Sequence, residues 1–145
     1  MSDCVLDTTV VSLSNKELLS RQIGGAFDRA LSIIEDIVSG TRRIRYNPRL
    51  VNEYGKHINR HNNDAIHVLF QLLDSDRAFF VATNSLRRHE YALAIRKCRW
   101  PSHDQHLIAA AIGGVDPSIF VTEARHAVCA GKVHRYLGIE IHHIT

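Results

Sequence analysis

The stretch Val5-Leu6-Asp7-Thr8-Thr9-Val10-Val11-Ser12 decides the fold of this chain. Apolar residues on both sides of one acid predict a short buried strand that ends at Asp7. A lone carboxylate in an apolar run needs a partner, because burying an unpaired charge is costly. Thr9 can orient this carboxylate through a hydroxyl hydrogen bond. We therefore expect Asp7 to belong to a functional site.

A second stretch, His103-Asp104-Gln105-His106-Leu107-Ile108-Ala109-Ala110-Ala111-Ile112, predicts a helix that opens with an acid and then turns apolar. Asp104 falls in the first turn, where the helix dipole favours a negative charge. An acid at the end of a strand and another at a helix N-terminus commonly line one cleft of an α/β fold. Carboxylates gathered in this way hold Mg²⁺ or Mn²⁺.

Strands and helices alternate along the rest of the chain. We expect further strands at 42–46, 78–82, 119–122 and 138–144, with helices between them and a basic helix at 85–97. Asn47-Pro48 offers a helix cap followed by a first-turn proline, and Gly40 is placed to end a helix. The alternation predicts one domain over residues 1–145, an α/β/α sandwich around a mainly parallel sheet of about four or five strands.

Composition narrows the function classes. The formal charge of +3 and the ten histidines are compatible with a polyanionic partner. The scattered Cys4, Cys98 and Cys129 lack zinc-ligand spacing and indicate a reduced, cytoplasmic protein. We expect no membrane association, since no apolar run reaches about 18 residues and no signal-peptide pattern opens the chain. The absence of a Gly-x-Ser-x-Gly stretch argues against a serine hydrolase.

Two more acids can join Asp7 and Asp104. Glu53 lies at the flank of the apolar stripe of the helix after Pro48. The alternative to a role in the site is that Glu53 is an ordinary solvated helix residue. Thr122-Glu123 falls at the end of the strand at 119–122. If that strand is parallel and adjacent to the first, Asp7 and Glu123 share the carboxyl edge of the sheet. The remaining acids in helices and turns are expected to be surface charges: Asp28, Glu35, Asp36, Asp74 and Asp76.

The order and spacing of these motifs resemble the PIN-domain ribonuclease family over essentially the whole chain. That family opens with a strand ending in Asp-x-Asn or Asp-x-Thr/Ser, as in Asp7-Thr8-Thr9, and continues with a helical Glu, as in Asn52-Glu53-Tyr54. An Asp then opens an Ala-rich helix, as Asp104 does here. The resemblance implies that Asp7, Glu53 and Asp104 form a catalytic acidic cluster.

The last motif departs from the family pattern. The family closes its site with a strand ending in Thr-x-Asp, whereas this chain has Thr122-Glu123-Ala124. Ala124 therefore occupies the position of the fourth acid. Three explanations stay open: Glu123 reaches the metal instead, three acids are enough, or an aspartate was replaced by alanine and cleavage was disabled. Asp116 is a poor substitute, because it precedes the strand.

The resemblance implies a metal-dependent endoribonuclease, most like the toxin of a bacterial toxin–antitoxin pair. Mg²⁺ or Mn²⁺ would be held by Asp7, Asp104 and a fourth acid, with Glu53 nearby. The expected partners are an RNA substrate, a second copy of the chain in a homodimer, and an antitoxin or other regulatory protein. The alternative is an inactive PIN-like module that binds RNA or a protein partner, which Ala124 favours.

Basic and aromatic side chains offer possible RNA contacts. One basic group is Arg42, Arg43 and Arg45, and a second is Arg87, Arg88, Arg96, Lys97 and Arg99. An ordinary solvated face explains either group equally well. Trp100 can stack on a base, although a lone Trp is more often a core residue. We expect the histidines without metal-ligand spacing to be surface or phosphate-contacting groups: His57, His61, His103, His106, His126, His134, His142 and His143.

Overall fold

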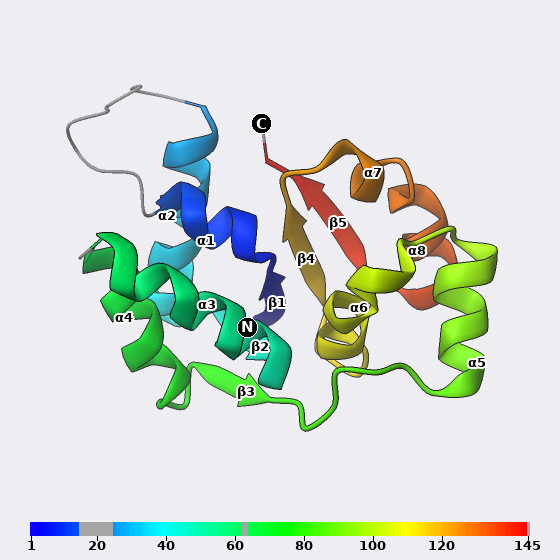
Figure 1. Cartoon of the computed structure of the whole chain (residues 1–145), viewed down its shortest axis with the longest axis horizontal. Helices are drawn as coiled ribbons and strands as arrows, with labels where there is room; N and C mark the ends of the chain where they lie inside the picture. The colour runs from blue at the N-terminus through cyan, green and yellow to red at the C-terminus, as the bar shows by residue number, and fades with distance from the viewer. Residues whose placement is uncertain (15–24, 62–63, 145) are drawn as a thin grey trace.

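A five-stranded sheet, parallel throughout, organises the molecule (Figure 1). The computed structural model describes residues 1–14, 25–61 and 64–144. The strand order is β3-β2-β1-β4-β5, so the N-terminal strand lies at the centre of the sheet. The strands are β1 (Ser2–Leu6), β2 (Arg42–Tyr46), β3 (Ala78–Phe80), β4 (Ser118–Val121) and β5 (Glu140–His143).

Helices cover the two faces of this sheet in separate groups (Figure 1). One group contains α1 (Thr8–Ser14), α2 (Ala26–Ser39), α3 (Pro48–His61) and α4 (Asp64–Leu73). The other contains α5 (Arg88–Tyr91), the π-helix η2 (Ala92–Lys97), the 3₁₀ turn η3 (Ser102–Asp104), α6 (Gln105–Ala111), α7 (Ala124–Ala127) and α8 (Ala130–Leu137). The expected three-layer α/β/α sandwich is confirmed. Within the described ranges, no helix combines the length and apolar character that crossing a membrane requires.

The central position of β1 explains its sequence. Cys4, Val5 and Leu6 are fully buried, as is typical of a parallel strand with helices on both faces. The strand ends before Asp7, as predicted, and α1 begins at once with Thr8. Val10 and Val11 therefore belong to a helix rather than to the strand, and both pack in the core.

The predicted helix boundaries around β2 are confirmed. Gly40 follows α2 with a φ of 86°, a left-handed conformation that glycine adopts without strain. Asn47 precedes α3, and its Oδ1 accepts the backbone N–H of Leu50 at 3.2 Å. This cap satisfies one of the free N–H groups at the start of the helix. Gly40 thus ends α2 before β2, and Asn47 begins α3 directly after β2.

Two parts of the second helical layer differ from expectation. The predicted basic helix at 85–97 is a single turn, α5, followed by the π-helix η2. The helix expected from 103 is divided, so that Asp104 closes the turn η3 and stands at the N-cap position of α6. Helices α7 and α8 had no prediction, and Val133 is the buried residue of α8. Val133, Tyr136 and Leu137 pack on the core at helical spacing, so the sequence does carry an amphipathic signal for α8, although over eight residues only.

Candidate active site

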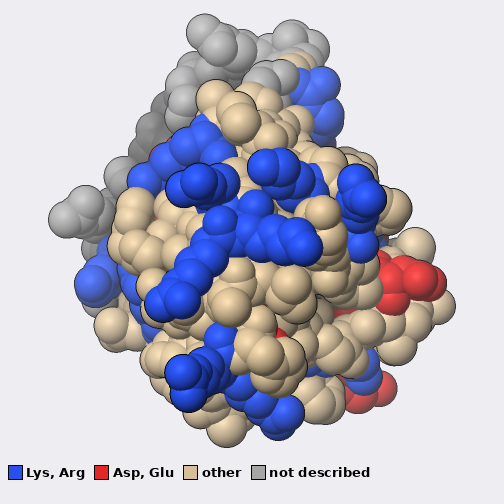
Figure 2. Space-filling view, turned by 90° about the vertical axis from the view of Figure 1, so that its right-hand side faces the viewer, with Lys and Arg blue, Asp and Glu red and all other residues tan. Residues whose placement is uncertain are grey.

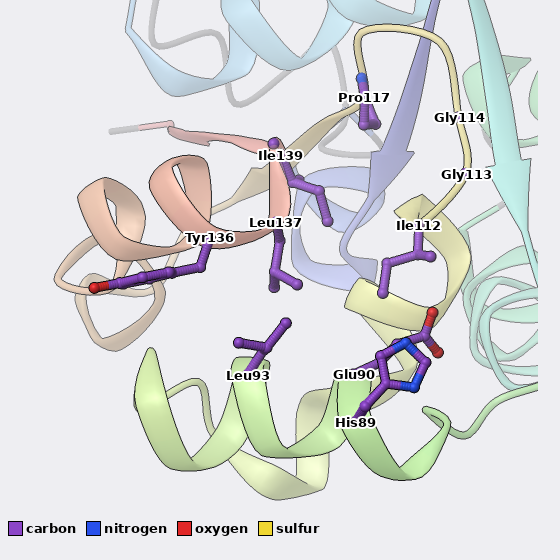
Figure 3. A pocket seen from close by; sticks show the side chains of 11 residues that line it. His89, Glu90, Leu93, Ile112, Gly113, Gly114, Pro117, Tyr136, Leu137 and Ile139 are labelled. Atoms are coloured by element: carbon purple, nitrogen blue, oxygen red, sulfur yellow. The ribbon is translucent and has the colours of Figure 1, made fainter.

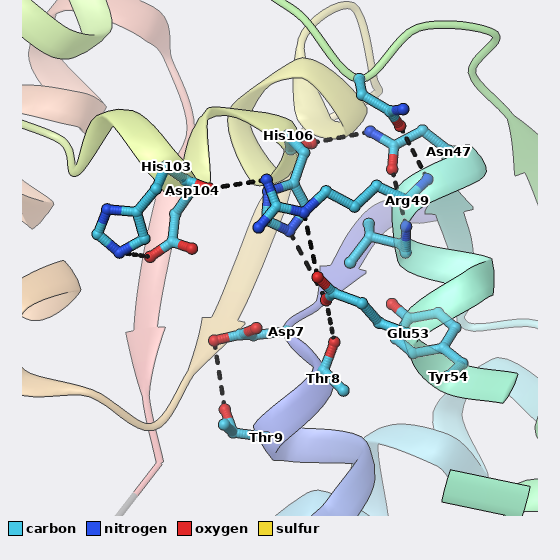
Figure 4. Close-up of polar contacts among 12 residues, drawn as sticks. Asp7, Thr8, Thr9, Asn47, Arg49, Glu53, Tyr54, His103, Asp104 and His106 are labelled. Carbon is cyan, nitrogen blue, oxygen red and sulfur yellow. Dashed lines mark hydrogen bonds and ion pairs between the residues drawn. The ribbon is translucent and has the colours of Figure 1, made fainter. Parts of the chain in front are cut away.

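The three predicted acids meet at the carboxyl edge of the sheet (Figure 4). Asp7 follows β1, Asp104 stands at the N-cap position of α6, and Glu53 projects from α3. The backbone N–H of Asp7 donates to the carbonyl of Phe120 at 3.0 Å, which ties this edge to β4. Because β1 and β4 are parallel neighbours, Glu123 also lies at this edge, as predicted.

Asp7 is buried without an arginine or lysine partner among the described residues. Its side chain is 9% exposed, and the Thr9 hydroxyl donates to Oδ2 at 3.2 Å. Thr122 in turn donates to Thr9 Oγ1 at 2.7 Å, so the predicted orienting role of Thr9 is confirmed and extended to β4. Burial raises the pKa of Asp7 above its usual value, aided by the charge of Asp104 and opposed by that of His126. Asp7 therefore carries its charge at a cost.

Three basic side chains contact one oxygen of Asp104. His126 Nε2 lies 2.8 Å from Oδ2, Arg125 Nη2 lies 3.0 Å away and His103 Nε2 lies 3.5 Å away. Burial by itself would raise the pKa of Asp104, but the hydrogen bond and charge of His126 outweigh it and lower the pKa. Among the described contacts none involves Oδ1 of Asp104. One oxygen is thus fixed, and the other is available to a ligand.

Both carboxylate oxygens of Glu53 are engaged. Oε1 accepts from Arg49 Nε at 3.1 Å, and Oε2 accepts from the Thr8 hydroxyl at 2.6 Å (Figure 4). Arg49 also donates to the main-chain oxygen of His103 at 2.8 Å. Glu53 and Arg49 therefore join α3 to the start of α1 and to the turn that precedes Asp104.

Ala124, where the resemblance expects a fourth acid, is followed by a cation. Ala124 is the exposed first residue of α7. The Glu123 carboxylate lies 2.5 Å from Arg125 Nε, and Arg125 Nη2 lies 3.0 Å from Asp104 Oδ2. Arg125 thus bridges the acid that was expected to replace the fourth ligand and the acid that was expected to hold the metal.

Two histidines are core residues, which corrects the expectation that the histidines are surface groups. His106 is 2% exposed and His126 is fully buried, where it packs against Trp100 at a centroid distance of 4.7 Å. Among the described residues, both ring nitrogens of His106 and Nδ1 of His126 lack a hydrogen-bond partner. Burial lowers the pKa of His106, helped by the charge of Arg49.

The other histidines follow the prediction where they are described. His103, His134, His142 and His143 are exposed, whereas the side chains of His57 and His61 lie outside the described residues. His106 directly precedes the apolar run from Leu107 to Ile112, and this run is the sequence signal that could have indicated a buried His106. No comparable signal surrounds His126.

The basic residues that were predicted to contact RNA fall into two groups, those with an acidic partner and those without one among the described residues. Arg42 pairs with Asp36 at 3.1 Å and Arg43 with Asp3 at 2.8 Å, so their predicted role in RNA binding competes with existing ion pairs. Arg96, Lys97 and Arg99 are exposed and have no acidic partner among the described residues.

Trp100 belongs to the core. It is 1% exposed, and its indole N–H donates to the main-chain oxygen of Asp104 at 2.9 Å. The core alternative for Trp100 is therefore confirmed, and its indole hydrogen bond connects the core to the main chain at Asp104.

A pocket of about 340 Å³ lies apart from the acids, between η2, α8 and the loop after α6 (Figure 3). Leu93, Ile112, Leu137 and Ile139 form its apolar walls, with His89 and Glu90 at one end. None of the predicted site residues lines it. The candidate active site is therefore the acidic edge and not this pocket.

The acidic edge fits a metal ion that is only partly coordinated by protein. Within the described ranges, no group of three or more His, Cys, Asp or Glu side chains is arranged to hold a metal. Asp7, without a cationic partner, and Oδ1 of Asp104 together offer two carboxylates. Mg²⁺ is commonly bound through one or two carboxylates, with water and substrate phosphate supplying the other ligands.

Comparison with known proteins leaves this site to be interpreted on its own geometry. A scan against models of protein families finds no match to the chain, and a search of curated proteins finds none either.

Proposed function

We propose that this chain is a metal-dependent endoribonuclease of the PIN type. The observation that carries the proposal is Asp7, a buried carboxylate with a raised pKa and no arginine or lysine beside it in the described structure. A fold that leaves an acid in this state loses stability, and such costs are typical of functional sites. A divalent cation at Asp7 would supply the missing charge.

Asp7 and Oδ1 of Asp104 are the residues that would hold Mg²⁺ or Mn²⁺. When bound, the metal lowers the pKa of a water molecule and neutralises charge on the scissile phosphate. Thr9 and Thr122 fix the orientation of Asp7. His126 and Arg125 fix Oδ2 of Asp104 and direct the other oxygen away from them.

Glu53 is proposed as a positioning residue. Its two oxygens accept hydrogen bonds from Arg49 and Thr8, which hold the carboxylate between α3 and the start of α1. Thr8 directly follows Asp7, and Arg49 contacts the residue before Asp104. Glu53 therefore sets the spacing of the two metal-binding carboxylates.

The biological setting rests on the resemblance to PIN-domain toxins. Under this proposal, the chain is a cytoplasmic toxin that cleaves RNA, acts as a homodimer, and is controlled by an antitoxin or another regulatory protein. The compact α/β/α domain is compatible with each of these partners.

A second candidate function is an inactive module that binds RNA or a protein. It is favoured by Ala124 together with Arg125, whose guanidinium contacts both Glu123 and Asp104. In this arrangement the protein neutralises part of its own acidic cluster without a metal.

Cleavage assays separate the two candidates. Labelled single-stranded RNAs of mixed sequence are incubated with Mn²⁺ and wild-type protein, Ala124→Asp, Asp7→Asn or Asp36→Asn. The nuclease proposal expects wild-type cleavage that EDTA abolishes, a loss of about 100-fold or more in Asp7→Asn, and unchanged activity in Asp36→Asn. Activity in Ala124→Asp alone identifies a disabled nuclease. If neither the wild type nor Ala124→Asp cleaves RNA although both are folded, the nuclease proposal is rejected.

A further inference from the structure

One side of the molecule presents cations that have no acidic partners in the described structure. We call this side the basic face and define it by residues of η2, α8 and the link after η2: Arg96, Lys97, Arg99, Lys132 and Arg135. Figure 2 shows Lys and Arg side chains crowding the middle of this side, with acidic side chains mainly at its margin. All five residues are exposed.

The sequence explains the lack of partners. No acid occurs in residues 91–103 or in residues 124–139, the two segments that form this side. The arginines near the sheet are different, because Arg42, Arg43 and Arg49 each contact a carboxylate at 3.1 Å or less. Uncompensated charge concentrated on one face is the electrostatic feature by which proteins attract polyanions.

Local structure holds these cations in fixed places. Lys97 Nζ lies 4.4 Å from the ring centroid of Tyr136, and the Arg135 guanidinium lies 5.4 Å from the same ring. Arg99 adopts a φ of 64°, an uncommon conformation for a residue with a side chain. Such strain, and the π-helix that carries Arg96 and Lys97, are both features found often at functional sites.

The basic face is connected to the acidic edge through buried contacts. Arg99 precedes Trp100, which contacts both His126 and the main chain of Asp104. The thiol of Cys129 donates to the carbonyl of Arg99 at 3.2 Å and lies 3.5 Å from the carbonyl of Arg125. The main chains at Arg99 and Arg125 are thereby held near each other, and the side chain of Arg125 contacts Asp104 directly.

We propose that the basic face binds the phosphate backbone of single-stranded RNA and leads the strand past Arg99 and Arg125 to Asp7 and Asp104. This inference rests on the proposed function for its endpoint. An acidic protein is the competing partner, but the continuity of the cations with a site suited to phosphate chemistry favours RNA. Cations that follow a surface track are typical of sequence-independent binding to single strands.

Fluorescence anisotropy of a labelled single-stranded RNA tests the basic face in EDTA, so that cleavage plays no part. We expect Arg96→Gln/Lys97→Gln and Lys132→Gln/Arg135→Gln each to weaken binding by roughly tenfold near physiological salt. The slope of log K against log salt should become shallower by about 1.4 for each double variant, because two phosphate contacts are lost.

Arg29→Gln/Lys56→Gln is the matched control. It removes the same charge from exposed positions on α2 and α3, outside the basic face, and should change affinity by less than about twofold. Wild-type affinity in the basic-face variants overturns the inference. Loss of binding to poly-glutamate with unchanged RNA binding overturns it in favour of an acidic protein. If RNA binding depends on the basic face but the protein never cleaves RNA, the proposed nuclease function is rejected. The proposal that the basic face binds RNA is then still supported.

Discussion

Strand β1 has a buried aspartate near each end, and their surroundings are opposite. Asp3 is 1% exposed and Asp7 is 9% exposed. Asp3 receives Arg43 Nε at 2.8 Å, Arg45 at 3.7 Å and the backbone N–H of Val115 at 2.8 Å. Asp7 has no such arginine within the described structure. The two ends of one strand therefore have one acid with arginine partners and one without.

The pKa shifts follow this difference. Burial acts to raise the pKa of Asp3, but the hydrogen bond from Arg43, the N–H of Val115 and the two arginine charges lower it overall. Burial dominates at Asp7 and raises its pKa. Asp3 is surrounded by arginines, whereas Asp7 has none among the described residues. This difference in surroundings indicates different roles for the two acids. We interpret Asp3 as structural and Asp7 as functional.

The largest expected effect is the loss of stability in Asp3→Asn. The change leaves Arg45, which is 6% exposed, as a buried charge without its carboxylate. Removing one partner of a buried ion pair typically costs about 3 kcal/mol or more. We expect the free energy of unfolding to fall by about that amount, as measured by urea titration with Trp100 fluorescence.

Asp36→Asn is the control for Asp3→Asn. Asp36 pairs with Arg42, but both side chains are partly exposed, at 38% and 27%. Ion pairs in such positions contribute roughly 0–1 kcal/mol. Equal losses in the two variants would mean that Asp3 is not the structural acid that its contacts indicate.

The next expected effect has the opposite sign. Asp7→Asn removes a charge that burial disfavours, and the new side chain can still accept a hydrogen bond from Thr9. We expect a gain of about 1 kcal/mol in the free energy of unfolding near neutral pH, together with loss of cleavage. Asp104→Asn is the matched variant and should lose stability, because it removes the charged partner of His126 and Arg125.

The pH dependence follows from the direction of the shift at Asp7. The folded state binds the Asp7 proton more tightly than the unfolded state, in which the pKa of Asp7 is near 3.8. Stability therefore falls as the pH rises from that value through the raised pKa of the folded state. The advantage of Asp7→Asn over wild type should be small at acidic pH and complete above this window. An advantage that shrinks with rising pH would contradict the raised pKa of Asp7.

The sequence predicted the elements whose signals are local. The apolar run before Asp7 gave β1, Asn47-Pro48 gave the start of α3, and Gly40 gave the end of α2. Each of these signals depends on residues within a few positions of one another. The resemblance to the PIN-domain family also implied that Asp7, Glu53 and Asp104 lie together, and the parallel-strand argument placed Asp7 and Glu123 at one edge.

The partners of those acids were not predictable, because they come from distant segments. His126 meets Asp104 across 22 residues, and Arg43 meets Asp3 across 40. No pattern in the sequence distinguishes these cations from exposed ones until the fold brings the segments together. Asp3 escaped attention for the same reason, since an acid next to Ser2 resembles a surface position.

The smallest expected effect sharpens the contrast between Asp3 and Asp7 through metal binding. Mn²⁺ that binds the folded state at Asp7 and Asp104 should stabilise the wild type by about 0.4 kcal/mol when its concentration equals Kd, or roughly 1–2 °C in Tm. The rise should vanish in Asp7→Asn, which lacks a required carboxylate, and persist in Asp36→Asn. Circular dichroism measures the unfolding. An equal rise in Asp7→Asn would assign the metal to another site, and no rise in any form would remove the support for a metal at the acidic edge.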